Sequence, residues 1–403
     1  MKNGVWFWSS ILIAFQLFLF ANAQGEGKYQ TIGRVDEKKL AGQIPDPQIW
    51  ANDLSSDGKL LALFVVSINA RQTSAPSWIV VANAASSEIL KMERFGVRPG
   101  FIQGYAPQIA FTSDGKSLVV EDQQTVAVLD VPNLHTLRTI DPDRKGEFTI
   151  PTEMLVATET NTAVVSFGTG ASRGSDGKWP THNLVVDVTT GERLASWDAD
   201  DIPMAISPHG TFLAISNHEN ASPTVAVKIL DSRSGKSVAM LYPSPSQAPE
   251  KYSAVVMAKF LGDENVVLTP NNGADESGRD VASYLNIVRF KDSHPMQEIQ
   301  PRDYGPVGEV VVSANQNTFV AVSRYLATKY REHTHWRIPS ETKPELLVFG
   351  KGQGFQLDTR MPLPSLLGFR WSGTFDRSGV RISKDGSVIS VAAEYGVTVF
   401  ARK

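Results

Sequence analysis

The chain has 403 residues, of which 42% are hydrophobic and 20% are charged, and its formal net charge is -3. This composition is typical of a folded globular protein, and a chain of this length outgrows one simple core unless the core is built from repeated units. The small net charge excludes the strongly basic field that draws proteins to nucleic acid or to an anionic membrane. The absence of cysteine excludes disulfides, cysteine-bound metals, thiol catalysis and c-type haem attachment.

The first residues predict a cleaved export signal. Lys2 precedes an apolar run over 5–20, and Ala21-Asn22-Ala23 has the small-residue pattern of a cleavage site before Gln24. A retained membrane anchor would need about 20 apolar residues, and this run is shorter and is interrupted by polar residues. We therefore expect residues 1–23 to be a signal peptide, no membrane span after its removal, and a secreted or periplasmic protein.

The next segment predicts one isolated strand. Residues 29–35 alternate with period 2, and no hairpin partner stands beside them in the sequence. A polar connector follows over 36–47. We expect residues 24–48 to supply a closing strand and this connector, and residues 49–403 to form one repeat domain.

One pattern then returns along the chain: a tight turn of the type Ser-x-Asp-Gly that leads into a short apolar strand. It occurs at 55–64, 112–120, 207–215 and 383–391, with His209 in the place of Asp in the third copy. A pattern that recurs at long period indicates a repeat architecture. Four short strands with turns between them make one antiparallel blade of a β-propeller.

Seven such units follow one another. Their predicted strands are 60–66, 78–82 and 88–93; 109–111, 118–120, 125–131 and 136–140; 163–167, 184–188 and 194–197; 211–215, 224–230 and 237–241; 266–269 and 285–288; 308–313, 318–323, 345–349 and 355–357; 380–382, 388–392 and 397–400. The last unit lacks a fourth strand, whereas strand 29–35 lacks a partner. We expect these two to pair, which closes an all-β, seven-bladed propeller and removes its open edge.

The repeats resemble the WD40-like and YVTN-type β-propeller families. The resemblance rests on the Ser-x-Asp-Gly-Lys turns and on two Asp-x-x-x-Gly hairpins, Asp187 to Gly191 and Asp231 to Gly235, and it extends over almost all of the chain after residue 23. The repeated Trp-Asp pair of true WD40 units is missing. Families of this kind include scaffolds, lactone hydrolases and redox enzymes, so the resemblance implies a fold and leaves the function open.

The turns of each unit differ in length in a regular way. The first and third turns are short in most units. The second turn is long in units one, three, four, five and six, over 67–77, 168–183, 217–223, 270–283 and 324–344. Second turns all lie on one face of a propeller. Long insertions confined to one face predict a binding face, with tolerated surface variation as the alternative.

The densest group of candidate binding residues lies in the long turn of unit six. It contains Arg331, His333, His335, Trp336 and Arg337. Arginine with aromatic residues is the composition of a recognition surface, which predicts a protein partner or a small anionic or sugar-like ligand. The His-x-His spacing places two imidazoles on one side of an extended segment, so His333 and His335 are weak candidates for a divalent metal. Two solvated histidines are the alternative.

Further candidates come from units three and five. Trp179 and His182 stand in the second turn of unit three, and Arg279 in that of unit five. Ser172 lies in a Gly-x-Ser-x-Gly match, but a nucleophile elbow leads into a helix, and the Gly and Pro residues that follow exclude one here.

We therefore expect an exported, non-enzymatic binding module without a cofactor, which uses the face of the long second turns. The rival hypothesis is a metal-assisted, lactonase-like hydrolase with a site over the central channel and with His333 and His335 among its metal ligands.

Overall fold

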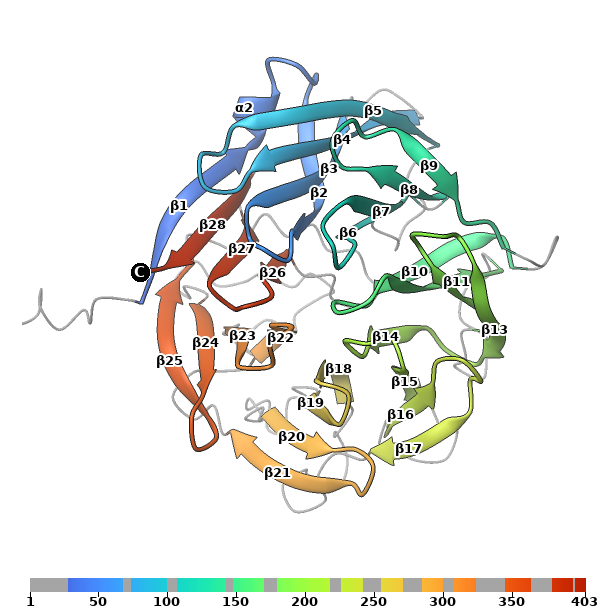
Figure 1. The fold of residues 1–403 in the computed structure, drawn as a ribbon. Helices are drawn as coiled ribbons and strands as arrows, with labels where there is room; N and C mark the ends of the chain where they lie inside the picture. Colours follow the sequence, from blue (N-terminus) through green and yellow to red (C-terminus); the bar gives the residue numbers. More distant parts are fainter. Residues whose placement is uncertain are drawn as a thin grey trace, which may run out of the picture.

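The computed structural model of the chain is a ring of seven four-stranded antiparallel sheets, the blades of a β-propeller (Figure 1). The predicted fold class is confirmed. The structure describes residues 28–67, 74–99, 107–122, 124–142, 148–169, 180–217, 226–241, 255–270, 285–299, 307–323, 345–363, 379–393 and 396–403. Among these residues no helix is long and apolar enough to cross a membrane.

Blades 1 to 6 each consist of four strands that follow one another in the chain, from the innermost to the outermost. Blades 1 to 3 contain β2 (Pro47–Leu54), β3 (Leu60–Ser67), β4 (Ser74–Asn83) and β5 (Ile89–Pro99); β6 (Gln108–Phe111), β7 (Ser117–Glu121), β8 (Val126–Asp130) and β9 (Thr136–Thr139); and β10 (Ile150–Val156), β11 (Thr162–Gly168), β12 (Thr181–Asp187) and β13 (Arg193–Ala199). Blades 4 to 6 contain β14 (Pro203–Ile206), β15 (Phe212–Asn217), β16 (Ala226–Asp231) and β17 (Ser237–Leu241); β18 (Val255–Leu261), β19 (Asn265–Pro270), β20 (Leu285–Arg289) and β21 (His294–Ile299); and β22 (Val307–Val312), β23 (Thr318–Ser323), β24 (Glu345–Lys351) and β25 (Phe355–Pro362).

Blade 7 is assembled from both ends of the chain. It contains β26 (Val380–Ile382), β27 (Val388–Ala393) and β28 (Gly396–Arg402), and its outermost strand is β1 (Tyr29–Asp36). β1 pairs with β28 in antiparallel register from Tyr29 opposite Arg402 to Asp36 opposite Gly396. The predicted closure of the ring by the N-terminal strand is thereby confirmed, and Figure 1 shows the two segments side by side.

The hydrophobic core lies between facing blades. Middle strands such as β11 are buried on both faces, which explains their continuous apolar sequences. One cluster joins Val128 of blade 2 to Val165 and Phe167 of blade 3, and another joins Ile287 of blade 5 to Phe319 of blade 6. Each blade therefore contributes to two cores, one with each neighbour.

Several elements differ from the sequence prediction. The innermost strands β2, β10, β14 and β18 were not predicted as separate strands, because short sequences such as Pro203–Ile206 carry little period-2 signal. The connector after β1 contains a short helix, α2 (Glu37–Leu40), whose first turn is capped by the Asp36 carboxylate, which accepts a hydrogen bond from Lys39 N. β3 and β4 extend to Ser67 and from Ser74, so their connection is shorter than the predicted 67–77.

Candidate functional site

The two faces of the ring carry connections of different length. On one face, first and second strands are joined by short segments such as 55–59 and 262–264, and third and fourth strands by equally short segments such as 84–88 and 352–354. On the other face, the segments that join second and third strands vary widely in length. The shortest is 394–395 in blade 7, and the longest is 324–344 in blade 6. We call these the turn face and the variable face.

The first turns of blades 1, 2, 6 and 7 share one hydrogen-bonded design. In blade 7 the buried Ser383 hydroxyl donates to Asp385 Oδ1 at 2.7 Å and accepts a hydrogen bond from Val388 N at 2.9 Å. Asp385 Oδ1 also accepts a hydrogen bond from Ser387 N at 2.9 Å. The equivalent residues are Ser55, Asp57 and Leu60; Thr112, Asp114 and Ser117; and Ser313, Asn315 and Thr318. This local bonding explains why the Ser-x-Asp pattern recurs.

The copy in blade 6 was not recognised in the sequence. There Asn315 replaces the aspartate, and Gln316 takes the position of the glycine with φ 60°. Gly58, Gly115, Gly210 and Gly386 occupy the same position with φ between 68° and 76°. The left-handed conformation is thus retained in blade 6 although its usual residue is lost.

Hydrogen bonds link the first turns from blade to blade. Their donors and acceptors are Ser56 Oγ to Ser113 O (3.2 Å), Ser113 Oγ to Asn161 Oδ1 (2.8 Å), Glu159 N to Pro208 O (2.8 Å), His209 N to Asp263 Oδ1 (3.3 Å), Asn315 N to Lys384 O (2.9 Å) and Lys384 N to Ser56 O (2.7 Å). These bonds connect every successive pair of blades except blades 5 and 6. The polar groups of the turn face therefore serve mainly to hold the ring together.

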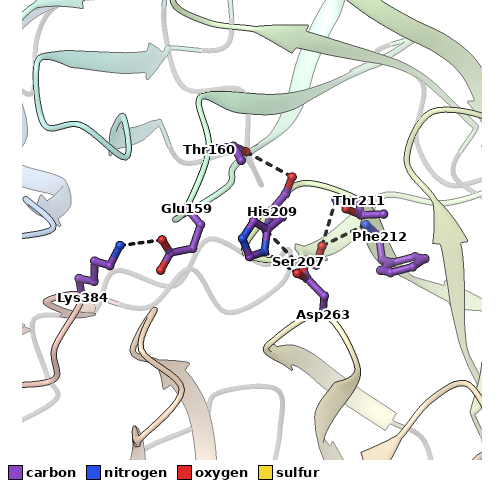
Figure 2. Close-up of polar contacts among 8 residues, drawn as sticks. All are labelled: Glu159, Thr160, Ser207, His209, Thr211, Phe212, Asp263 and Lys384. Carbon is purple, nitrogen blue, oxygen red and sulfur yellow. Dashed lines mark hydrogen bonds and ion pairs between the residues drawn. The ribbon is translucent and has the colours of Figure 1, made fainter.

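One ion pair joins blades that are not neighbours. Lys384 Nζ in the first turn of blade 7 lies 2.6 Å from Glu159 Oε2 in the first turn of blade 3 (Figure 2). Glu159 occupies the position of Asp57 in blade 1, and its longer side chain faces the lysine across the axis of the ring. The pair is partly exposed, with side-chain exposures of 51% for Lys384 and 21% for Glu159.

His209 stands where other first turns have aspartate, and its side chain contacts the next blade. Its Nδ1 is hydrogen-bonded to Asp263 Oδ2, and Thr160 Oγ1 of blade 3 donates to its carbonyl oxygen at 3.3 Å (Figure 2). The imidazole therefore joins blade 4 to blade 5.

Side chains of outer strands also contact the third turn of the following blade. Trp197 Nε1 of blade 3 donates to Ser232 O of blade 4 at 2.8 Å, and its ring packs against Gly235, which has φ 65°. In the same way Arg138 of blade 2 lies against Gly191 of blade 3. The two Asp-x-x-x-Gly hairpins noted in the sequence are therefore contact points between blades.

At the variable face, the described part of blade 3 contains a buried polar network. Ser166 Oγ donates to Asn183 Oδ1 at 2.5 Å, Asn183 Nδ2 donates to Thr181 Oγ1 at 3.2 Å, and Thr181 Oγ1 donates to Asp201 O at 3.1 Å. His182 belongs to the same strand end. Its Nδ1 lies 2.7 Å from Asp198 Oδ1, and its side chain is 2% exposed. β12 begins at Thr181, so this candidate lies within a strand of the blade instead of within the connection 169–180.

The other sequence-predicted site residues lie outside the described part of the chain. They are Trp179, Arg279, Arg331, His333, His335, Trp336 and Arg337. Within the described ranges no group of three or more His, Cys, Asp or Glu side chains is arranged to hold a metal ion.

Sequence reasoning missed one charged pair on the innermost strands. Asp53 Oδ1 of β2 lies 3.2 Å from Arg381 Nε of β26, and Asp53 Oδ2 accepts a hydrogen bond from Phe111 N at 2.7 Å. Burial raises the pKa of the Asp53 carboxyl above its ordinary value, although the charge of Arg381 and the bond from Phe111 act in the opposite direction. A blade-by-blade alignment of the repeats is the signal that could have identified this pair.

Comparison with known proteins identifies the fold. No family model and no curated protein matches the chain. A chain in the crystal structure of the mitotic checkpoint complex aligns with a TM-score of 0.50 at 14% identity, covering 93% of this chain and 90% of that chain. A chain of Kuenenia stuttgartiensis hydrazine synthase aligns with a TM-score of 0.52 at 17% identity, covering 90% of this chain and 96% of that chain. At these identities the likeness concerns the fold alone, and the resemblance to WD40-like propellers is confirmed at the level of architecture.

Proposed function

We propose that the chain is an exported, non-enzymatic binding module that engages a protein partner through its variable face. The observation that carries this proposal is the contrast between the two faces. The turn face has short connections that are hydrogen-bonded from blade to blade. The connections of the variable face differ in length, from residues 394–395 in blade 7 to residues 324–344 in blade 6. Loops that vary in length on a rigid scaffold are where propellers and other repeat proteins place their binding residues.

The composition of the longest connection supports a protein partner. Arg331, Trp336 and Arg337 belong to the residue types that carry most binding energy at protein interfaces. The chain as a whole has a net charge of only -3, so recognition would rest on local contacts more than on long-range attraction. A small anionic or sugar-like ligand would use the same arginines and is distinguished by the experiment below.

Site-specific photo-cross-linking in the native host tests which face binds. A photoreactive residue at position 336 should give discrete cross-linked protein bands. The matched control is the same residue at Lys116, an exposed position of the turn face. Bands from position 116 alone would overturn the assignment of the face. Bands from neither position, together with saturable binding of a sulfated oligosaccharide that is lost in Arg331→Ala/Arg337→Ala, would replace the protein partner with an anionic ligand.

Export and the absence of a cofactor need separate measurements. N-terminal sequencing of the protein from the envelope fraction or the medium should begin at Gln24, and an intact N-terminus at Met1 in the cytoplasm would contradict export. Metal analysis of the purified protein should give no stoichiometric metal. Stoichiometric metal that disappears in His333→Ala/His335→Ala, along with lactone hydrolysis that disappears in parallel, would instead support the hydrolase alternative.

A further inference from the structure

The junction between blades 7 and 1 differs in kind from every other junction of the ring. Neighbouring blades are consecutive in the chain everywhere else, whereas this junction brings together β2 and β26, from opposite ends of the sequence. This junction must therefore form between two segments that are far apart in the sequence.

The repeats can be aligned by one backbone hydrogen bond across the first turn. It runs from the first turn residue to the carbonyl five positions later and measures 2.9 Å in each of six blades: Ser55 to Leu60, Thr112 to Ser117, Ala157 to Thr162, Ser207 to Phe212, Ser313 to Thr318 and Ser383 to Val388. Blade 5 has a shorter first turn and is left out of the alignment. Equivalent positions in the other blades follow directly from this bond.

At the closing junction, polar side chains replace apolar ones. The position of Asn52 in blade 1 is held elsewhere by Ile109, Met154, Met204, Val310 and Val380. The position of Ser390 in blade 7 is held by Ala62, Val119, Val164, Ala214 and Val320. The position that carries Asp53 in blade 1 and Arg381 in blade 7 is held by Ala110, Leu155, Ala205 and Val311. Among the six aligned blades, the four exceptions all lie at the same junction. In blade 5, strand pairing places Lys259 at the position of Asp53, and its Nζ donates to the backbone oxygen of Met204 in blade 4 at 3.4 Å.

These exceptions are paired with each other. Asn52 is 1% exposed, Ser390 is 0% exposed, and Asn52 Nδ2 donates to Ser390 Oγ at 3.2 Å. Asp53 and Arg381 form the ion pair at 3.2 Å, with side-chain exposures of 15% and 30%. We call these four residues the polar seam.

A polar seam discriminates between partners in a way that an apolar junction does not. At these three positions the other aligned blades carry apolar residues, so burial of these residues alone favours many pairings nearly equally. Polar contacts at other positions, such as Gln108 Nε2 to Glu153 Oε1 at 3.1 Å between blades 2 and 3, add to the discrimination. If the faces of blades 1 and 7 were docked on an apolar face, Asn52 would be buried without Ser390, and Asp53 would be buried without the charge of Arg381. Burying an unpaired amide or carboxylate is strongly unfavourable. The pairing of blade 7 with blade 1 gives Asn52 Nδ2 an acceptor and gives Asp53 an opposite charge, whereas Asn52 Oδ1 stays without a hydrogen-bond partner among the described residues.

We propose that the polar seam specifies ring closure, so that blade 7 docks on blade 1 of the same chain and not on another blade or on a second copy. Its role lies in the uniqueness of the closed monomer more than in its stability. A buried polar pair can fix register and assembly state in this way while contributing little net free energy.

The test replaces the seam with residues that occur at its equivalent positions. The variant Asn52→Ile/Asp53→Ala/Arg381→Val/Ser390→Val should keep the β-sheet circular dichroism and a melting temperature equal to or above that of the full wild-type chain. After refolding from urea at increasing protein concentration, light scattering coupled to gel filtration should show a several-fold larger oligomer fraction than in wild type. The matched control, Leu155→Ala/Val164→Ala, weakens an apolar junction. It should lower the melting temperature and remain monomeric.

A charge exchange covers the case in which the apolar variant does not fold. Asp53→Arg and Arg381→Asp each place like charges at the seam and should increase oligomers, whereas the double variant restores opposite charges and should recover monomer relative to both single variants. The proposal is overturned if the apolar seam stays monomeric at every concentration, if the Leu155→Ala/Val164→Ala control forms as much oligomer, or if the double exchange recovers nothing.

Discussion

Lys384 Nζ and Glu159 Oε2 meet at 2.6 Å across the axis of the ring, and they connect blade 7 directly to blade 3. Among the described residues, the other hydrogen bonds given above between first turns each link neighbouring blades. The pair therefore constrains two blades that are otherwise coupled only through the blades between them.

Removing this cross-axis pair should have a small, salt-dependent effect. Because Lys384 is half exposed, Lys384→Met should lower the free energy of unfolding by at most about 1 kcal/mol in low salt and by less in high salt. Urea unfolding of Lys384→Met, Glu159→Gln and the double variant measures the coupling. Fully additive single effects in low salt would show that the two side chains do not stabilise each other.

Two glycines allow the effect of contact between blades to be separated from the effect of backbone conformation. Gly235 and Gly115 have φ 65° and 68°, but a Cβ at Gly235 would lie 2.8 Å from Trp197, whereas a Cβ at Gly115 would meet nothing within 4 Å. Gly115→Ala should cost roughly 1–2 kcal/mol for the left-handed conformation. Gly235→Ala should cost about 1–3 kcal/mol more because Trp197 must move. Thermal unfolding gives the ranking, and the tryptophan fluorescence of the folded protein should change only in the Gly235 variant, because Trp197 contacts Gly235. Equal losses would contradict the packing argument.

The aspartates of the repeated turns should make the protein sensitive to acid. Partial burial acts to raise the pKa of Asp57 and Asp385, but hydrogen bonds from neighbouring hydroxyl and amide groups outweigh it and lower both pKa values. Since the folded state binds these protons more weakly than the unfolded state, the stability they contribute is present above their ordinary pKa. It is lost as the pH falls through the lowered folded pKa.

Asparagine should remove this acid sensitivity and keep the turn. Asn315 already performs the role in blade 6, where its Oδ1 accepts a hydrogen bond from Asn317 N at 3.0 Å. Asp57→Asn/Asp385→Asn should therefore lose less stability than wild type when urea unfolding is repeated from neutral pH down to about pH 3. Glu192→Gln, which removes an exposed carboxylate from the third turn of blade 3, serves as the control. An unchanged pH dependence in the double variant would show that other groups are responsible.

Asp53 should have the opposite effect on stability at low pH from Asp57 and Asp385. Its pKa is raised mainly by burial, so the folded state binds this proton more tightly than the unfolded state, and protonation of Asp53 stabilises the fold as the pH falls. Asp53→Asn removes that contribution, and the variant should lose stability more steeply on acidification than wild type. The difference between their unfolding free energies, measured by urea unfolding across pH, gives the effect. A shallower acid slope in the variant would mean that the ion pair with Arg381 dominates.

The fold could be predicted from the sequence because its units repeat. The Ser-x-Asp-Gly turns marked the blades, and the orphan strand at 29–35 together with the incomplete last unit indicated the closure that β1 and β28 form. The turn of blade 6 escaped recognition because backbone hydrogen bonding retains the conformation when Asn315 and Gln316 replace the usual residues. Local patterns identify such a turn only while its typical residues are present.

The functional residues were harder to predict, for a physical reason. Repeated residues are those that every blade requires for its fold. Residues that make contacts specific to one place in the ring differ from the repeated ones. His209, Glu159 and Asp53 are all such departures, and each forms a contact with another blade that no spacing rule within one blade contains. His182 was assigned to a loop because its strand begins with the polar residues Thr181 to Asn183, which the buried network of blade 3 satisfies.

The pairing of β1 with β28 also has a consequence for how the chain reaches its native state. Ribosomes make Tyr29–Asp36 before blades 1 to 6 and Gly396–Arg402 after them, so blades 1 to 6 can assemble from neighbouring segments before β1 has a partner. Contacts of such long sequence separation form slowly. Completion of blade 7 is therefore expected to be the rate-limiting event in folding, and a nascent chain that lacks its final strand retains an unpaired β1 edge open to other chains.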